Sequence, residues 1–317
     1  MSDVISDAVR KGYGSVAKSG LSSDQGNIKG IANAFGYSDE ELASIPAEAN
    51  MGLSCGNPVA MASIREGETV VDLGAGGGLD VFLASKSVGP DGQAIGIDMT
   101  GDMVSLARKN AKKGGYENVK FYLAEIEHMP LPDNSVDCVI SNCVLNLCAD
   151  KDVALKEVFR ILKPGGRFAI SDIALRKELP EAIKKEVAAW TGCIAGALST
   201  DQNRDALLRA GFSQVDIQDA HSDLNAYKDG GHAACCGPES DADMSGGGCC
   251  SEPAPEPAPV KEESGFCCGE CTDDEKAEKS DEQVASQYHD TMSDLLDNFD
   301  VNEYAGSFKI FALKPAS

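Results

Sequence analysis

The stretch that decides the fold is VVDLGAGGGLDVF, at residues 70–82. Apolar residues lead into Asp72, glycines then recur at every second position from 74 to 78, and an apolar helical pattern starts at Leu79. This order predicts a buried parallel strand, a tight turn and the N-terminus of a helix. Such a turn needs glycine because its backbone takes unusual dihedral angles and lets a ligand come into direct contact.

A second predicted strand, at 94–99, carries Asp98 near its end, where a carboxylate can accept hydrogen bonds from a ribose. The spacing differs from the G-x-G-x-x-G of a dinucleotide site, which would need glycine or alanine in place of Leu79. The pattern D-x-G-x-G-x-G resembles the first motif of class I methyltransferases that use S-adenosylmethionine (SAM). Glycine-rich turns of this kind also bind other nucleotides, and some are only tight turns.

Length and charge limit the classes of function. The 317 residues suffice for a full α/β core and favour a single domain with attachments. We find no run of about 18 apolar residues and no apolar signal core near the N-terminus, so we expect a soluble, cytoplasmic protein without a membrane partner. Of the net charge of −23, residues 229–300 carry −16, from 19 acidic and 3 basic residues. An acidic chain repels phosphate backbones, which argues against a nucleic-acid partner.

Apolar periodicity predicts alternating strands and helices between residues 69 and 219. Strands are predicted at 69–73, 94–99, 119–124, 137–142, 167–173 and 214–219, and helices at 80–87, 101–113, 151–162, 180–191 and 200–210. Earlier helices are predicted at 2–18, at 27–35 and after a capping box of Ser38 and Glu41. Thr100 and Asp150 suit helix N-caps, and residues 163–166 (KPGG) indicate a helix stop and turn. This alternation predicts an α/β fold with a doubly wound, mostly parallel sheet.

The alternation breaks after residue 221. Residues 229–279 are rich in Gly, Ser, Pro, Glu and Ala and are predicted to be disordered, followed by a helix at 280–299 and a strand at 307–313. Class I methyltransferases, whose sheet is Rossmann-like and seven-stranded, end in a strand that runs antiparallel between strands five and six. If 307–313 is that strand, the acidic stretch is an insertion that leaves the sheet at its ligand-binding carboxyl edge.

Four parts of the chain follow from these patterns. Residues 1–66 supply N-terminal helices and a loop that cap the site, and 67–228 form the SAM-binding core with a substrate region at about 175–212. Residues 229–300 form the acidic insertion, and 301–317 the final strand.

The 12 cysteines are expected to be mostly thiols in a reducing compartment. Cys138 lies inside the fourth strand and is predicted to pack in the core, while Cys148, at most on the rim of the site, is assigned no role. Three others stand in separate segments: Cys55 before the first strand, Cys143 after the fourth, and Cys193 at the end of a helix. Either these cysteines only pack, or their thiolates converge on one soft centre.

Further stretches resemble arsenite methyltransferases: MGLSCGNP at 51–58, GIDMT at 96–100, AEIEHMPLPDNSVD at 124–137, SNCVLNL at 141–147, LKPGGRFAISDI at 162–173 and GCIAGAL at 192–198. Quinone and sterol methyltransferases of the same fold lack these cysteine contexts. The resemblance implies that As(III) binds Cys55, Cys143 and Cys193. It also implies the cofactor contacts: the methionine end of SAM at Asp72, Gly74, Gly76 and Gly78, the ribose at Asp98, and the adenine at Met99, Glu125 and Ile126. The long insertion departs from the family's usual length.

The implied chemistry needs no general base. Three thiolates hold soft, pyramidal As(III) with its lone pair outward, and the lone pair attacks the sulfonium methyl in line, so alignment supplies most of the catalysis. Methyl transfer formally oxidises arsenic, and its reduction consumes two electrons. Thiols that form a disulfide can supply them, and a thioredoxin- or glutathione-type reductant then resets the enzyme.

The insertion holds seven further cysteines: Cys235, Cys236, Cys249, Cys250, Cys267, Cys268 and Cys271. Three interpretations are open. The cysteines are incidental residues of a linker, or they bind zinc, although the apolar residues usual around a zinc site are missing. Our hypothesis is that they are accessory thiols that capture As(III). Two other functions remain open for the whole chain. One is C-methylation of a quinone- or sterol-type lipid, and the other is sequestration of a metalloid without catalysis.

Overall fold

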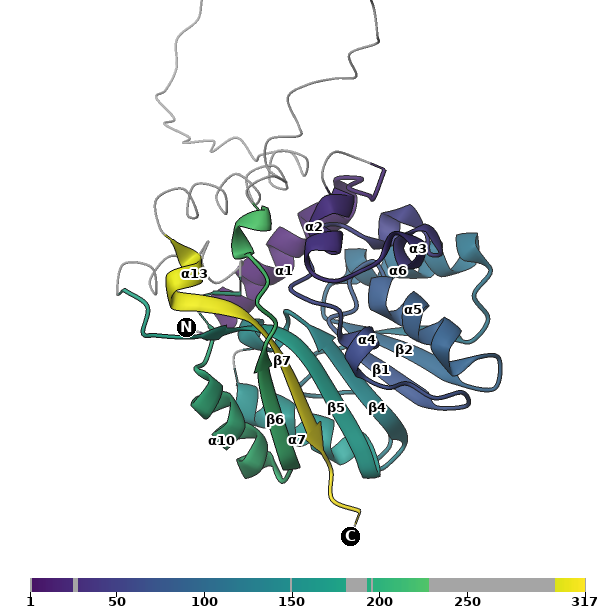
Figure 1. Ribbon diagram of the computed structural model, residues 1–317. Helices are drawn as coiled ribbons and strands as arrows, with labels where there is room; N and C mark the ends of the chain where they lie inside the picture. The colour runs from purple at the N-terminus through teal and green to yellow at the C-terminus, as the bar shows by residue number, and fades with distance from the viewer. Residues whose placement is uncertain are drawn as a thin grey trace, which may run out of the picture. The chain divides into compact units, whose positions relative to one another are not determined.

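The computed structural model describes residues 2–24, 28–148, 150–180, 193–194, 196–227 and 300–316. In these residues seven strands form one sheet in the order β3-β2-β1-β4-β5-β7-β6 (Figure 1). The strands are β1 (Thr69–Leu73), β2 (Gln93–Asp98), β3 (Val119–Leu123), β4 (Val136–Asn142), β5 (Leu162–Leu175), β6 (Ser213–Asp219) and β7 (Ala305–Leu313). β7 alone is antiparallel to its neighbours, which confirms the predicted doubly wound, mostly parallel sheet.

Helices cover both faces of this sheet. They are α1 (Ser2–Lys18), α2 (Ile28–Ala34), α3 (Asp39–Ala43), α4 (Pro58–Met61), α5 (Leu79–Val88), α6 (Gly101–Gly114), α7 (Lys151–Ile161), α10 (Thr200–Ala210) and α13 (Val301–Tyr304), with 3₁₀ turns η1 (Ala47–Ala49), η2 (Leu145–Leu147) and η3 (Leu224–Tyr227). Val71 and Val139 pack with α7 and α10, whereas Val70 and Ile140 pack with α5 and α6. This alternation follows from the two-residue period of a strand. No helix in the described part of the chain is long and apolar enough to cross a bilayer.

The last strand lies where it was predicted. β7 pairs antiparallel with both β5 and β6, so that Ile310 lies between Ile170 and Ile217. The chain therefore leaves the sheet after β6 and returns through α13 at the same edge. The disorder predicted at 229–279, the helix predicted at 280–299 and nearly all of the helix predicted at 180–191 fall outside the described residues.

The caps predicted from the sequence are present at α3 and α7, whereas the predictions for Thr100 and for residues 163–166 differ from the structure. The Ser38–Glu41 capping box is present, and the Asp150 side chain caps α7 by accepting from the Val153 N–H at 3.0 Å. Thr100 precedes α6 but makes no side-chain capping bond. The predicted turn at 163–166 is instead a bulge inside β5, because Leu162 pairs with Val136 while Arg167 already pairs with Cys138.

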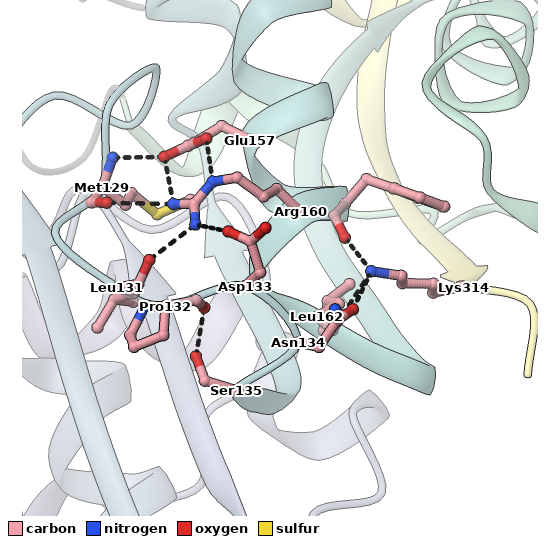
Figure 2. A network of polar contacts seen from close by, with 11 residues as sticks. Met129, Leu131, Pro132, Asp133, Asn134, Ser135, Glu157, Arg160, Leu162 and Lys314 are labelled. Carbon is pink, nitrogen blue, oxygen red and sulfur yellow. Dashed lines mark hydrogen bonds and ion pairs between the residues drawn. The ribbon is translucent and has the colours of Figure 1, made fainter.

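A polar network fixes the loop that joins β3 to β4 (Figure 2). The Arg160 guanidinium, on α7, donates to the Leu131 carbonyl at 2.8 Å and pairs with Asp133 and Glu157. The Glu157 carboxylate in turn accepts the Met129 N–H at 2.8 Å. One planar guanidinium binds both carboxylates and loop carbonyls, so this network fixes the conformation of the loop between β3 and β4. The first residues of the same loop line the cavity described below.

Candidate active site

A cavity of about 620 Å³ lies at the carboxyl ends of β1, β2 and β4. Its wall includes Asp72 and the turn after β1, Asp98 and Met99 after β2, and Cys143 after β4. Helix α1 contributes Arg10 and Tyr13, among others. Carboxyl ends of parallel strands are where open α/β sheets bind ligands, so the cavity is the candidate site.

The glycine turn is shaped by close packing. Gly74 has φ +65°, and a Cβ there would lie 2.8 Å from Cγ1 of Val144. Gly78 has φ +98° and precedes α5, and a Cβ there would lie 2.6 Å from the Phe82 ring. Gly74 and Gly76 line the cavity as expected, whereas Gly78 is absent from the lining and shapes the turn from behind.

Asp98 joins the ends of two strands. One carboxylate oxygen accepts the Gly76 N–H at 2.9 Å, and the other accepts the Thr100 N–H at 2.8 Å. Burial raises the pKa of Asp98 despite these hydrogen bonds. Burial also raises the pKa of Asp72 well above its usual value, with further contributions from the charges of Asp80 and Asp98. The cavity thus holds three neighbouring carboxyl groups, an environment that favours a cationic ligand.

The remaining cofactor residues expected from the sequence also line the cavity. Met99, Glu125 and Ile126 lie on its wall, as does His128. The Arg10 guanidinium, from α1, pairs with the Glu125 carboxylate at 3.1 Å. α1 is therefore fastened to the loop after β3 beside the cavity.

The three cysteines from separate segments meet at one place. Cys55 and Cys143 form a disulfide with their Cα atoms 5.7 Å apart, and the Cys193 thiol donates to the Cys143 carbonyl at 2.8 Å. Cys143 and Cys193 take left-handed backbone angles, with φ of +60° and +63°. Cys143 lies on the cavity wall, and Cys55 and Cys193 are buried behind it.

The structure shows two of the three predicted thiols in the oxidised state, while the prediction that all three bind As(III) stays a prediction. Of Cys55, Cys143 and Cys193, only Cys193 carries a free thiol in this state. The physical reason is that the loop before β1 brings its cysteine within bonding range of the residue that ends β4. Burial raises the pKa of the Cys193 thiol well above its usual value.

Hydrogen bonds hold the Cys55 segment from three sides. The Cys55 N–H donates to the Asn142 side-chain oxygen at 3.0 Å, and the Ser307 hydroxyl, on β7, donates to the Cys55 carbonyl. The Tyr227 hydroxyl donates to the Ser54 carbonyl at 2.7 Å and lies 3.3 Å from the Cys55 sulfur. Ser307 of the last strand and Tyr227, two residues before the insertion, thus both contact the cysteine loop.

Comparison with known proteins identifies the fold family. The family described as "Methyltransferase domain" matches residues 64–222, half of the chain. The chain belongs to this methyltransferase family.

Two curated relatives of this chain are named arsenite methyltransferase. The methyltransferase is 46% identical over 198 residues to a Halobacterium salinarum protein named arsenite methyltransferase, covering 62% of this chain and 50% of that protein. It is 34% identical over 158 residues to an Aquipseudomonas alcaligenes protein of the same name, covering 48% of this chain and 46% of that protein. The chain therefore spans about half the length of these curated relatives. These matches confirm the resemblance to arsenite methyltransferases seen in the motifs.

A solved structure supports the fold alone. Haemonchus contortus phosphoethanolamine N-methyltransferase 2, in complex with S-adenosyl-L-methionine, has a TM-score of 0.58 at 15% identity. The alignment covers 91% of this chain and 57% of that one.

Near Cys193, whose pKa is raised by burial and then by the charge of Asp172, the methyltransferase holds a buried carboxyl group. Asp172 is 4% exposed, and one of its oxygens accepts from the Asn146 amide at 2.9 Å and the Ile173 N–H at 2.8 Å. Its other oxygen has no hydrogen-bond partner among the described residues. Burial raises the pKa of Asp172 to about 7.

Cys148 and Cys138 contrast with each other. Cys148, to which the sequence assigned no role, lies on the cavity wall, and its sulfur donates to the Val144 carbonyl at 3.7 Å. Cys138 is fully buried in the core on the face covered by α5, as predicted.

In the described part of the chain no cluster of three or more His, Cys, Asp or Glu side chains has the arrangement of a metal site. The seven insertion cysteines lie outside that part.

Sequence reasoning missed several residues of the methyltransferase site. Asp80 lines the cavity, and Asn142, also on the wall, holds the cysteine loop. Their positions carried a weak signal, since Asp80 follows the glycine turn and Asn142 precedes Cys143. Tyr37 and Tyr227 carried none, because they become neighbours of the site only through the fold.

Proposed function

We propose that this methyltransferase transfers a methyl group from SAM to trivalent arsenic held by cysteine sulfur, yielding methylated arsenicals in a detoxification reaction. The meeting of Cys55, Cys143 and Cys193 beside the cavity is the observation that carries the proposal. Thiol sulfur is a ligand that soft metalloids prefer. A methyltransferase of lipids or other carbon substrates would have no use for three cysteines at this position.

The cavity suits SAM on physical grounds. Gly74, Gly76 and Gly77 line the cavity without side chains, so the turn offers bare backbone to a ligand. Asp72, Asp80 and Asp98 place carboxyl groups along the wall, and these complement a ligand with positive charge. When bound, SAM supplies an electrophilic methyl group on a sulfonium sulfur. In this proposal Asp72 and the glycine turn hold its methionine end, Asp98 its ribose, and Met99, Glu125 and Ile126 its adenine.

The protein's part in the reaction is to hold and orient the arsenic. Reduction of the Cys55–Cys143 disulfide, by a thioredoxin- or glutathione-type thiol, adds two thiols to that of Cys193. Each thiol that binds arsenite replaces a hydroxyl group and releases water. The arsenic lone pair must then face the cavity, on whose wall Cys143 lies. Alignment of this lone pair with the methyl group is the main catalytic contribution we assign to the chain.

The test uses purified protein, arsenite, SAM and a thiol reductant, with arsenic species separated over time. We expect methylated arsenic from the wild type, and loss of product or arrest after one methyl group in Cys55→Ser, Cys143→Ser and Cys193→Ser. Cys138→Ser is the matched control, because this cysteine is buried on the face covered by α5. Binding of SAM without methylated arsenic would favour a lipid substrate. Binding of arsenite without SAM consumption would favour sequestration.

A further inference from the structure

Asn142, the last residue of β4, holds the cysteine loop with its side-chain amide. The amide oxygen accepts the Cys55 N–H at 3.0 Å, and the amide nitrogen donates to the Gly56 carbonyl at 2.8 Å. Cys143 follows Asn142 directly in the chain. Asn142 is therefore connected to both disulfide partners. Its side chain binds the backbone of Cys55, and Cys143 is the next residue in the chain.

The same amide reaches the cofactor side of the cavity. Its nitrogen lies 2.8 Å from the Tyr37 hydroxyl and 3.1 Å from a carboxylate oxygen of Asp80. The Tyr37 hydroxyl donates to the other Asp80 oxygen at 2.7 Å. Asp80 belongs to the first turn of α5, lines the cavity and raises the pKa of Asp72. Burial raises the pKa of Asp80 itself to about 6, so its charge depends on these hydrogen bonds.

The residue on the other side of Cys143 also contacts the cofactor turn. Val144 packs so closely over Gly74 that a Cβ on this glycine would lie 2.8 Å from Cγ1 of the valine. Both sequence neighbours of Cys143 thus contact the glycine turn or the helix that follows it, one through hydrogen bonds and one through packing. Displacement of Cys143 would disturb both contacts.

We propose that Asn142 is a positioning residue that couples the redox state of Cys55 and Cys143 to cofactor binding; the inference rests on the proposed SAM site. The disulfide fixes the residues that pack on the glycine turn, so the cavity is preorganised when the pair is oxidised. Reduction by two glutathione molecules gives two thiols and glutathione disulfide, and it releases that constraint. Binding free energies are reciprocal, so the cofactor must oppose reduction by the same factor by which reduction weakens its binding.

The experiment equilibrates full-length protein in glutathione redox buffers with and without S-adenosylhomocysteine, which binds without donating a methyl group. Mass spectrometry of the peptides that carry Cys55 and Cys143 reports their oxidised fraction apart from the insertion cysteines. We expect S-adenosylhomocysteine to shift the equilibrium about tenfold towards the disulfide, and to bind the oxidised protein about tenfold more tightly in calorimetry. Asn142→Ala should reduce both factors to less than twofold.

A purely structural role for Asn142 would change the disulfide equilibrium without changing its response to S-adenosylhomocysteine. If Asn142→Ala does not fold, Tyr37→Phe removes the hydroxyl that hydrogen-bonds with both Asn142 and Asp80 and should also weaken the coupling. Tyr116→Phe is its control, since Tyr116 packs on Phe82 and donates weakly to the Ser44 carbonyl. Equal affinity in both redox states overturns the coupling and leaves the proposed cofactor intact. No binding of S-adenosylhomocysteine in either state overturns both.

Discussion

The hydroxyl oxygen of Tyr227 lies 3.3 Å from the sulfur of Cys55. Tyr227 ends η3, and the described chain resumes at Asp300, just ahead of α13. Asn302 of α13 joins the two sides of this gap, because its side chain accepts the Leu224 N–H at 3.0 Å and donates to Asp223 at 2.6 Å. The segments on either side of the insertion are therefore tied together next to the cysteine pair.

Tyr227→Phe should change the reactivity of Cys55. The ring still packs against Phe35, with centroids 5.1 Å apart in the wild type, so loss of the hydroxyl should cost only about 1 kcal/mol of stability. After reduction the hydroxyl can turn from the Ser54 carbonyl towards the Cys55 sulfur, and a hydroxyl donor stabilises a thiolate. We therefore expect the reduced Cys55 of the variant to alkylate several-fold more slowly at pH 7. Iodoacetamide labelling, followed peptide by peptide, measures the rate. An unchanged rate at Cys55 would show that the hydroxyl does not influence the thiolate.

Asp172→Asn should alter how stability depends on pH. Burial raises the pKa of Asp172 to about 7, so the folded protein holds this proton more tightly than the unfolded chain does. The contribution of Asp172 to stability is therefore fully present below the unfolded pKa of about 4 and is lost as the pH rises towards 7. Relative to wild type, the variant should gain about 2 to 3 kcal/mol in unfolding free energy between pH 5 and pH 8.

Denaturant unfolding at each pH measures this gain for Asp172→Asn. Asp201→Asn, at an exposed position in the first turn of α10, serves as the control and should track the wild type. A constant difference between Asp172→Asn and wild type across this pH range would contradict a raised pKa.

Gly74→Ala should weaken cofactor binding, and Gly67→Ala is the matched control for the backbone cost. Both glycines have positive φ, +65° and +80°, so both substitutions carry a backbone cost of about 1 to 2 kcal/mol. A Cβ at Gly67 meets nothing within 4 Å, whereas at Gly74 it collides with Val144. We expect affinity for S-adenosylhomocysteine to fall more than tenfold only in Gly74→Ala, as measured by calorimetry. Equal losses in the two variants would show that packing against Val144 is unimportant.

Deletion of residues 230–279 tests the hypothesis of accessory thiols. If the insertion cysteines capture As(III) near the site, deletion should raise the apparent KM for arsenite and leave kcat unchanged, because only the local concentration falls. Arsenite-dependent methylation rates measure both constants. Replacing all seven insertion cysteines by serine should have the same effect with the chain length preserved. Unchanged KM in both variants would refute the hypothesis.

The sequence was sufficient for the sheet and the glycine turn because their signals are local. Apolar periodicity placed β1 to β6, and the glycines between β1 and α5 marked the turn. The position of β7 between β5 and β6 was predicted from the resemblance to class I methyltransferases. The apolar pattern of one strand does not indicate which strands it pairs with. The bulge at 163–166 was missed because Pro and Gly in sequence indicate a turn, whereas pairing between β4 and β5 resumes around them.

The disulfide and its supporting contacts could not be predicted for a different reason. Cys55 and Cys143 are 88 residues apart, and Cys143 has a left-handed backbone that no sequence pattern marks. Tyr37 lies in the loop between α2 and α3, Asp80 in α5 and Asn142 at the end of β4. Asp80 and Asn142 stand inside the quoted motifs, but those motifs do not show that the two side chains meet. Their common feature is a set of hydrogen bonds between buried side chains, which exists only after the sheet has formed.

The Cys55–Cys143 bond also has a consequence for the unfolded chain. It closes a loop that spans β1, β2 and β3, about 88 residues long. Such a cross-link reduces the conformational entropy of the unfolded state, which favours folding by about 4 to 5 kcal/mol in the chain-entropy account. Reduction removes that contribution, a large share of the roughly 5 to 15 kcal/mol that stabilise a typical domain. Under the proposed function the bond opens before arsenic binds, so the reduced protein should be less resistant to heat and proteolysis than the oxidised one. A metalloid that bridges the same thiols would restore the cross-link.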